Sequence, residues 1–125
     1  MFVSLALPEY VKADLLSEFD ATFNETGSLL SQDALIERAL LRDGEAKVRR
    51  SAVFAASFRS LWILLSPLRQ AVLSDTDDGV RGDIVTTLGR SPATPGVLDV
   101  LQAVATRDGS PDVRAAAARA ISGRP

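Results

Sequence analysis

The residues of this chain best suited to chemistry are three acid–base pairs with one repeated spacing. In each copy an Asp is followed five and six residues later by Val-Arg, and then by an apolar-periodic stretch. The pairs are Asp43 with Arg49, Asp75 with Arg81, and Asp108 with Arg114. A carboxylate can act as a general base, but an adjacent Arg lowers its pKa and makes it a poor base at neutral pH. A catalytic pair is also needed only once, so the threefold recurrence favours a structural role.

The remaining composition offers little for catalysis or for binding a metal. The chain has no Cys and no His, which excludes a thiol nucleophile, a zinc-thiolate site and the usual general base near neutral pH. Asp75, Asp77 and Asp78 cluster, but their spacing does not match a calcium-binding loop. Phosphate loops and dinucleotide motifs are absent. We therefore expect no catalytic residues, no metal and no cofactor.

The elements that must position these pairs are read from the repeat period. The three Asp residues lie 32 and 33 residues apart, which is typical of stacked helical repeats. Apolar residues at offsets of four predict helix pairs that pack inward through one set of positions. These positions are Val48, Ala52 and Ala56, then Val80, Ile84 and Leu88, then Val113, Ala117 and Ile121.

The helix boundaries follow from caps and breakers. Helices are predicted from about 31 to 42, from 45 to about 57, from 61 to 74, up to Gly89, from Pro95 to 107, and onward from Ser110. Pro67 predicts either a kink in its helix or a helix start at Ser66. Thr94 is predicted to cap a helix that has Pro95 at its first position, and Ser110-Pro111-Asp112 predicts another helix start.

The N-terminal part is expected to close one end of the stack. Residues 8–24 carry one apolar stripe at a spacing of four, which predicts an amphipathic helix that caps the first repeat. The predicted organisation is an N-terminal arm and capping helix over 1–30 and repeats over 31–125, divided at about 31–59, 60–91 and 92–123. The sequence assigns no role to residues 1–7.

Net charge and hydropathy favour a soluble, cytoplasmic protein. Residues 1–37 hold seven acidic residues against Lys12 alone, whereas 38–125 hold nine acidic against thirteen basic residues. The repeat region therefore has a net charge of only +4 (13 − 9), which does little to favour a nucleic-acid partner. The longest apolar stretch, 61–65, is far shorter than the roughly 20 residues of a membrane-spanning helix, so no membrane partner is expected.

The phrase of Asp, then Val-Arg, then small and apolar residues that end in Leu-Gly resembles the HEAT repeat. The closest likeness is to the short bacterial repeats of the phycobilisome-lyase type, in which a Pro often stands where Pro67 does. The resemblance implies an all-α, right-handed α-solenoid of about three helix pairs behind the N-terminal capping helix. It also implies a hydrogen-bonded ladder between successive repeats, in which Asp43, Asp75 and Asp108 pair with Arg49, Arg81 and Arg114.

If the second helices line the concave face, as in similar solenoids, the partner-binding row can be read from the sequence. It comprises Ser51, Phe54, Ala55, Phe58, Asp83, Thr86, Thr87, Arg90, Ala116, Arg119 and Ala120. Phe54 and Phe58 lie four apart and suit an aromatic anchor for a partner. Burial of both rings under the capping helix or against Trp62 is the alternative, and we favour it.

The function predicted from these features is non-catalytic: a curved surface that binds another protein as a scaffold, adaptor, inhibitor or immunity factor. One alternative is an accessory or chaperone subunit of an enzyme, by likeness to the lyase-type repeats. A less favoured one is nucleic-acid binding, as in HEAT-like DNA glycosylases. The apolar last helix, 115–121, also suggests self-association or burial against a partner.

Overall fold

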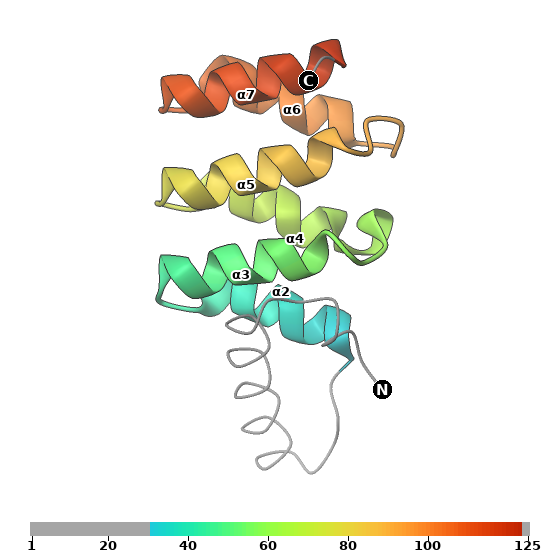
Figure 1. The fold of residues 1–125 in the computed structure, drawn as a ribbon, viewed down its shortest axis with the longest axis vertical. Helices are drawn as coiled ribbons and strands as arrows, with labels where there is room; N and C mark the ends of the chain where they lie inside the picture. Colours follow the sequence, from blue (N-terminus) through green and yellow to red (C-terminus); the bar gives the residue numbers. More distant parts are fainter. Residues whose placement is uncertain (1–30, 124–125) are drawn as a thin grey trace.

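The computed structural model describes residues 31–123 and contains six α-helices and no strand in that range (Figure 1). With the labels of Figure 1, they are α2 (Gln32–Arg42), α3 (Ala46–Ala56), α4 (Leu61–Ser74), α5 (Asp78–Gly89), α6 (Val97–Arg107) and α7 (Pro111–Ser122). The predicted capping helix and the arm before it lie outside the described residues.

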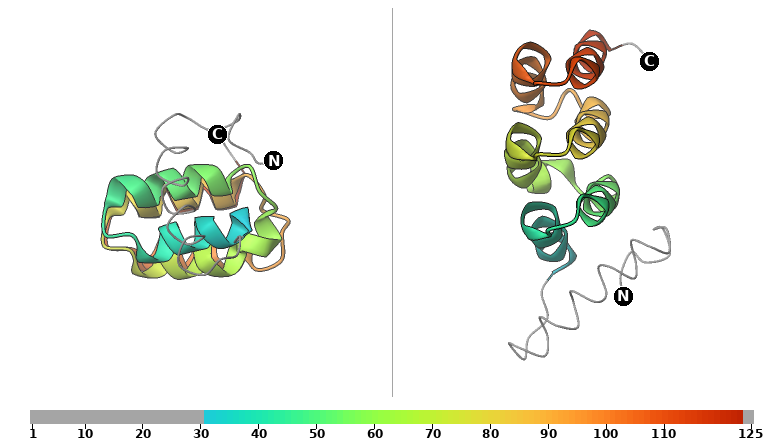
Figure 2. Two further views of the ribbon diagram at one scale, coloured as in Figure 1. Left: turned by 90° about the horizontal axis from the view of Figure 1, so that it is seen from below. Right: turned by 90° about the vertical axis from the view of Figure 1, so that its left-hand side faces the viewer.

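The helices form three pairs that stack along one axis (Figure 1). The first helices of the pairs, α2, α4 and α6, lie in one layer, and the second helices, α3, α5 and α7, lie in the other (Figure 2). Each pair packs on the next through both layers. This arrangement is an α-solenoid, and the predicted all-α repeat fold is confirmed.

Side-chain caps begin three of the helices. Ser31 accepts a hydrogen bond from the Ala34 N–H at the start of α2, at 3.1 Å. Asp77 caps α5 in the same way, at 3.0 Å from the Val80 N–H. The predicted start at Ser110 is confirmed, because its hydroxyl accepts from the Val113 N–H and Pro111 occupies the first turn of α7. In each case a backbone donor that the helix leaves unpaired finds an acceptor.

The predicted helix over 61–74 is confirmed, because α4 runs through Pro67, and the alternative start at Ser66 is excluded. One expectation about a helix start is wrong. The third pair does not start with a Thr94 cap and Pro95, because residues 94–97 form a turn in which the Val97 N–H donates to the Thr94 carbonyl. Gly96 closes that turn at a φ of 93°, a conformation that glycine adopts without strain.

The core lies between the two layers and contains most of the predicted inward positions. Ala52, Ala56, Val80, Ile84, Leu88, Val113 and Ala117 are buried, whereas Val48 and Ile121 are half-buried. Gly89, the last residue of α5, is needed for close packing. A Cβ at this position would lie 3.0 Å from the Cβ of Ala120 in α7. The absence of a side chain there therefore lets α5 and α7 approach.

Candidate functional site

Four of the predicted ladder residues form two bidentate ion pairs between successive repeats, Arg49 with Asp75 and Arg81 with Asp108. Arg49 donates through Nε and Nη2 to the two carboxylate oxygens of Asp75, at 2.8 and 3.1 Å. Its Nη1 donates to the backbone carbonyl of Asp43, at 3.0 Å. Arg49 and Asp43 therefore do contact each other, but through the backbone carbonyl, and the link to the next repeat is made with the Asp75 carboxylate.

We call each contact of an Arg with the Asp carboxylate of the next repeat a joint. The second joint, between Arg81 and Asp108, has the same geometry as the first. Arg81 binds both carboxylate oxygens of Asp108, at 2.8 and 3.1 Å, and the backbone carbonyl of Asp75, at 2.8 Å. Each Asp carboxylate also accepts from the N–H two residues later, at 2.9 Å, which fixes the turn between the helices. One Asp therefore shapes its own turn and holds the preceding repeat.

Electrostatics support a structural role for these pairs. The Asp75 and Asp108 side chains are 5 % exposed. Burial raises the pKa of Asp108, but hydrogen bonds from Arg81 and from the Ser110 N–H outweigh that effect and leave the pKa below its ordinary value. The hydrogen bond to Asp108 likewise raises the pKa of Arg81, against the opposing effect of burial. A carboxylate held ionised by two N–H donors of a guanidinium is a poor proton acceptor.

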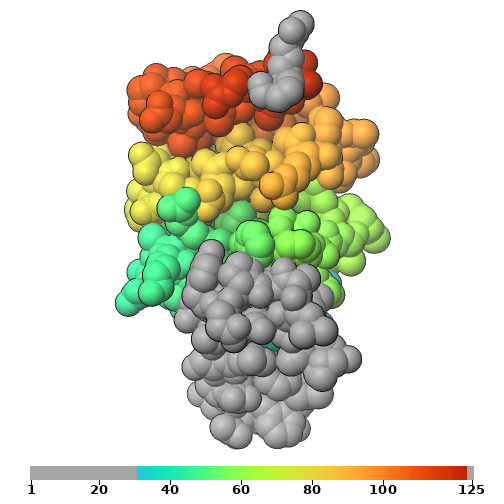
Figure 3. Space-filling view, viewed as in Figure 1, coloured from blue at the N-terminus to red at the C-terminus, as the bar shows by residue number. Residues whose placement is uncertain are grey.

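A hollow in the described surface lies between α3 and α5, on the face shown in Figure 3. Its volume is about 740 Å³. Its lining is contributed mainly by these two helices and mixes apolar, basic and acidic side chains: Ala46, Lys47, Arg50, Val53, Phe54, Ser57, Asp77, Asp83, Thr86, Thr87 and Arg90. We call this hollow the groove.

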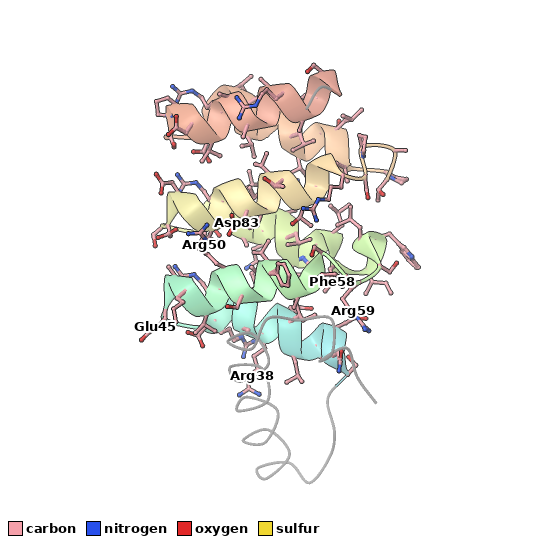
Figure 4. All side chains as sticks on the ribbon, viewed as in Figure 1. Arg38, Glu45, Arg50, Phe58, Arg59 and Asp83 are labelled. Carbon is pink, nitrogen blue, oxygen red and sulfur yellow. The ribbon has the colours of Figure 1, made fainter. Side chains whose placement is uncertain are left out.

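An ion pair crosses the groove from α3 to α5. Arg50 donates through Nε and Nη2 to the Asp83 carboxylate, at 2.7 and 3.2 Å, and Figure 4 shows the two side chains beside each other between the helices. Their side chains are 53 % and 38 % exposed, so the pair contributes little to stability. Gly79 leaves room for it, because a Cβ there would lie 3.2 Å from Arg50 Nη1.

The two aromatic residues of the predicted row are exposed. Phe54 lines the groove and is 37 % exposed, and Phe58, one turn later, is 49 % exposed. Their rings contact each other edge to face, with centroids 5.1 Å apart. The expected burial of both rings against Trp62 is therefore wrong, and their expected burial under the capping helix concerns residues outside the described range. Trp62, the proposed cover, is itself 74 % exposed on α4.

Other members of the predicted row face the packing between helices. Ser51 and Ala55 are buried, and Thr87 contributes to the groove only as part of its buried floor. The hydroxyls of Ser51 and Thr87 donate to the backbone carbonyls four residues earlier, both at 3.1 Å. Because a helix turns about 100° per residue, these positions rotate away from the surface on which Phe54 lies.

Asp83, Thr86 and Arg90 of the predicted row do line the groove, but Arg119 does not. Arg119 is exposed on α7, whereas Ala116 and Ala120 are half-buried against the core.

Sequence reasoning missed several lining residues of α3. Lys47 and Arg50 precede Phe54 by seven and four residues, and Ser57 follows it by three, so these residues share one helix face. Extending the row backward from Phe54 at this spacing would have found them.

The described residues offer neither a metal site nor a membrane-spanning helix. Within 31–123, no group of three or more acidic, His or Cys side chains could hold a metal ion. None of the helices described is long and apolar enough to cross a membrane.

Comparison with known proteins bears on the family. A family model of HEAT repeats matches residues 33–122, which includes all three ladder Asp residues. The match is to HEAT repeats in general and does not single out the phycobilisome-lyase type. No curated protein and no solved structure matches the chain.

Proposed function

The chain belongs to the HEAT-repeat family, whose members are commonly protein–protein interaction modules, and we propose that it binds a partner protein in the groove between α3 and α5 without catalysing a reaction. The observation that carries this proposal is the partly exposed Phe54 ring in the wall of the groove. Aromatic side chains in hollows of this kind often contribute most of the binding energy of an interface.

The surroundings of Phe54 suit an anchor. Its contact with Phe58 restricts the orientation of both rings, so a partner that packs on Phe54 loses little additional rotamer freedom. Val53 beside it is 1 % exposed and belongs to the core, which gives the anchor a rigid base. Apolar contact in the middle of the groove would therefore supply affinity.

The charged residues of the groove support a protein partner with at least one carboxylate. Lys47, Arg50 and Arg90 supply three basic groups, against Asp77 and Asp83. Arg50 and Asp83 bind each other, and Asp77 caps α5, so Lys47 and Arg90 are better placed to meet a charge on a partner. The acidic groups also make the groove a poor track for a phosphate backbone.

The test is affinity capture from lysate of the native host, with bound proteins quantified by mass spectrometry. The double variant Phe54→Ala, Arg90→Glu removes the anchor and reverses one charge of the groove. Trp62→Ala is the matched control, because it removes an exposed aromatic ring on α4, outside the groove. We expect the double variant to lose a specific partner at least roughly tenfold and the control to retain it.

Circular dichroism and the melting temperature establish that both variants are folded. Equal recovery of every captured protein by the wild-type chain and the folded double variant would refute binding in the groove.

A further inference from the structure

α7, the last of the described helices, exposes positions whose equivalents in α3 and α5 are buried. Val53 and Val85, each ten residues after the Asp of its repeat, are 1 % exposed. Ala118 holds the same position in α7 and is exposed. Three residues farther on, Leu88 is 0 % exposed, but Ile121 is only half-buried. Two positions that are buried in the earlier repeats are therefore more exposed in the third.

Arg114 shows the same contrast. Its Nη1 donates to the backbone carbonyl of its own Asp108, at 2.6 Å, as Arg49 and Arg81 do to theirs. In the two complete joints, Nε and Nη2 of the Arg hold the carboxylate of the next repeat. No carboxylate within residues 31–123 accepts a hydrogen bond from Nε or Nη2 of Arg114. Within the described residues, the Arg114 side chain therefore makes the carbonyl contact of a complete joint and not the carboxylate contact.

A hollow accompanies this open edge. It has a volume of about 530 Å³ and is lined by residues of α6 together with Ile121 of α7. Ala105, in its wall, occupies the position that Leu40 and Val72 hold in the earlier repeats, where each is 1 % exposed. The smaller side chain leaves space that an incoming apolar side chain would fill.

We propose that this C-terminal face, formed by α6 and α7, docks a helix pair of a partner protein by continuing the stack. The turn between the partner's helices presents an Asp or Glu to Nε and Nη2 of Arg114, and the partner's apolar side chains cover Ala118 and Ile121. This surface is distinct from the groove and uses none of its residues. The positive charge of the Arg114 guanidinium, and the carboxylates that Arg49 and Arg81 bind, indicate that the partner presents a carboxylate here.

A second copy of this chain is a poorer occupant. In a head-to-tail stack, α7 of one copy would pack on α3 of the next. The contact would use the side of α3 that is equivalent to the side of α5 packed on the preceding repeat. There, Ser51 is 1 % exposed and Ala55 is 0 % exposed, so neither residue offers surface for such a contact.

The test supplies a helix pair of known chemistry to the intact chain. A second copy of residues 92–123 is fused after Gly123, so that its turn presents the Asp equivalent to Asp108. We expect the added residues to fold as helix, and the extended chain to unfold in one transition at a higher temperature than the parent. In both chains Arg114→Gln removes the bond to the Asp108 carbonyl, so the parent is the control for that loss.

In the extended chain, Arg114→Gln should lower the equilibrium constant for folding roughly tenfold more than in the parent. An added turn carrying Asn in place of that Asp should abolish the difference. An added pair that stays unfolded, or equal losses in the two chains, would refute a stacking role for the face. Sedimentation velocity of the parent chain is expected to show no self-association, and association weakened by Arg114→Gln would instead make a second copy the occupant.

Discussion

Replacement of Arg81 by Gln tests whether the buried joint stabilises the solenoid. The change removes two hydrogen bonds to the Asp108 carboxylate and one to the Asp75 carbonyl. The carboxylate left behind is 5 % exposed, and its remaining donor among residues 31–123 is the Ser110 N–H. A buried charge that loses its partner costs about 3–5 kcal/mol, and the 15 % exposure of Arg81 lowers the expected loss to about 2–4 kcal/mol. Urea unfolding followed by circular dichroism measures this loss against a total stability of roughly 5–15 kcal/mol.

Arg50→Gln is the matched comparison. Arg50 also binds both oxygens of an Asp in the next repeat, at similar distances, but its side chain is 53 % exposed and that of Asp83 is 38 % exposed. Water screens this pair, so the expected loss is below about 1 kcal/mol. Equal losses for the two variants would show that burial does not distinguish the joints, and would refute the assignment of Arg81 as the structural member.

Three further predictions follow from packing and protonation. Gly89→Ala should lower the melting temperature because its Cβ would lie 3.0 Å from that of Ala120. Gly82→Ala, in the same helix, has nothing within 4 Å of its Cβ and should raise the free energy of unfolding by about 0.5–1 kcal/mol. A higher melting temperature for Gly89→Ala would contradict the close approach of α5 and α7. The pKa of Asp108 is lowered in the folded chain, so its ionised form stabilises the fold above the unfolded-state pKa, near 3.8, and that contribution is lost as pH falls through the lower folded value. Stability measured from pH 6 to pH 2 should therefore fall less steeply for Asp108→Asn than for the wild type, and parallel curves would argue against the lowered pKa. Ile84→Asp places a charge at a position that is 0 % exposed and should abolish the cooperative melting transition, so a wild-type melting curve would contradict its burial.

The sequence identified the residues of the joints but not their register. An Asp and an Arg six residues apart recur three times, which predicts that they meet, and each Arg does bind its own Asp through the backbone carbonyl. The carboxylates of Asp75 and Asp108 bind instead the Arg of the preceding repeat. A one-dimensional spacing cannot distinguish these two contacts, because the distance between repeats depends on how closely the helix pairs pack.

Recurrence between repeats would nevertheless have distinguished an Arg that holds the repeats together from an adjacent Arg that lines the groove. Arg49 and Arg50 are adjacent, and each binds both oxygens of an Asp in the second repeat. Arg49 recurs as Arg81 and Arg114, whereas the positions equivalent to Arg50 hold Gly82 and Ala115. The recurring Arg is 13 % exposed in the joint, and the one that occurs once is 53 % exposed in the groove.

The same reasoning explains why the groove is harder to predict than the fold. The same joint is needed between each two successive repeats, so its residues recur in the sequence. That recurrence indicates their structural role. A partner needs to be recognised only once, so the residues that meet it differ between equivalent positions. Phe54, Thr86 and Arg119 hold one such position, and the first two line the groove while the third, on α7, lies outside it. The proposed recognition surface therefore belongs to the first two repeats, which leaves α7 free to present its open face to a second partner.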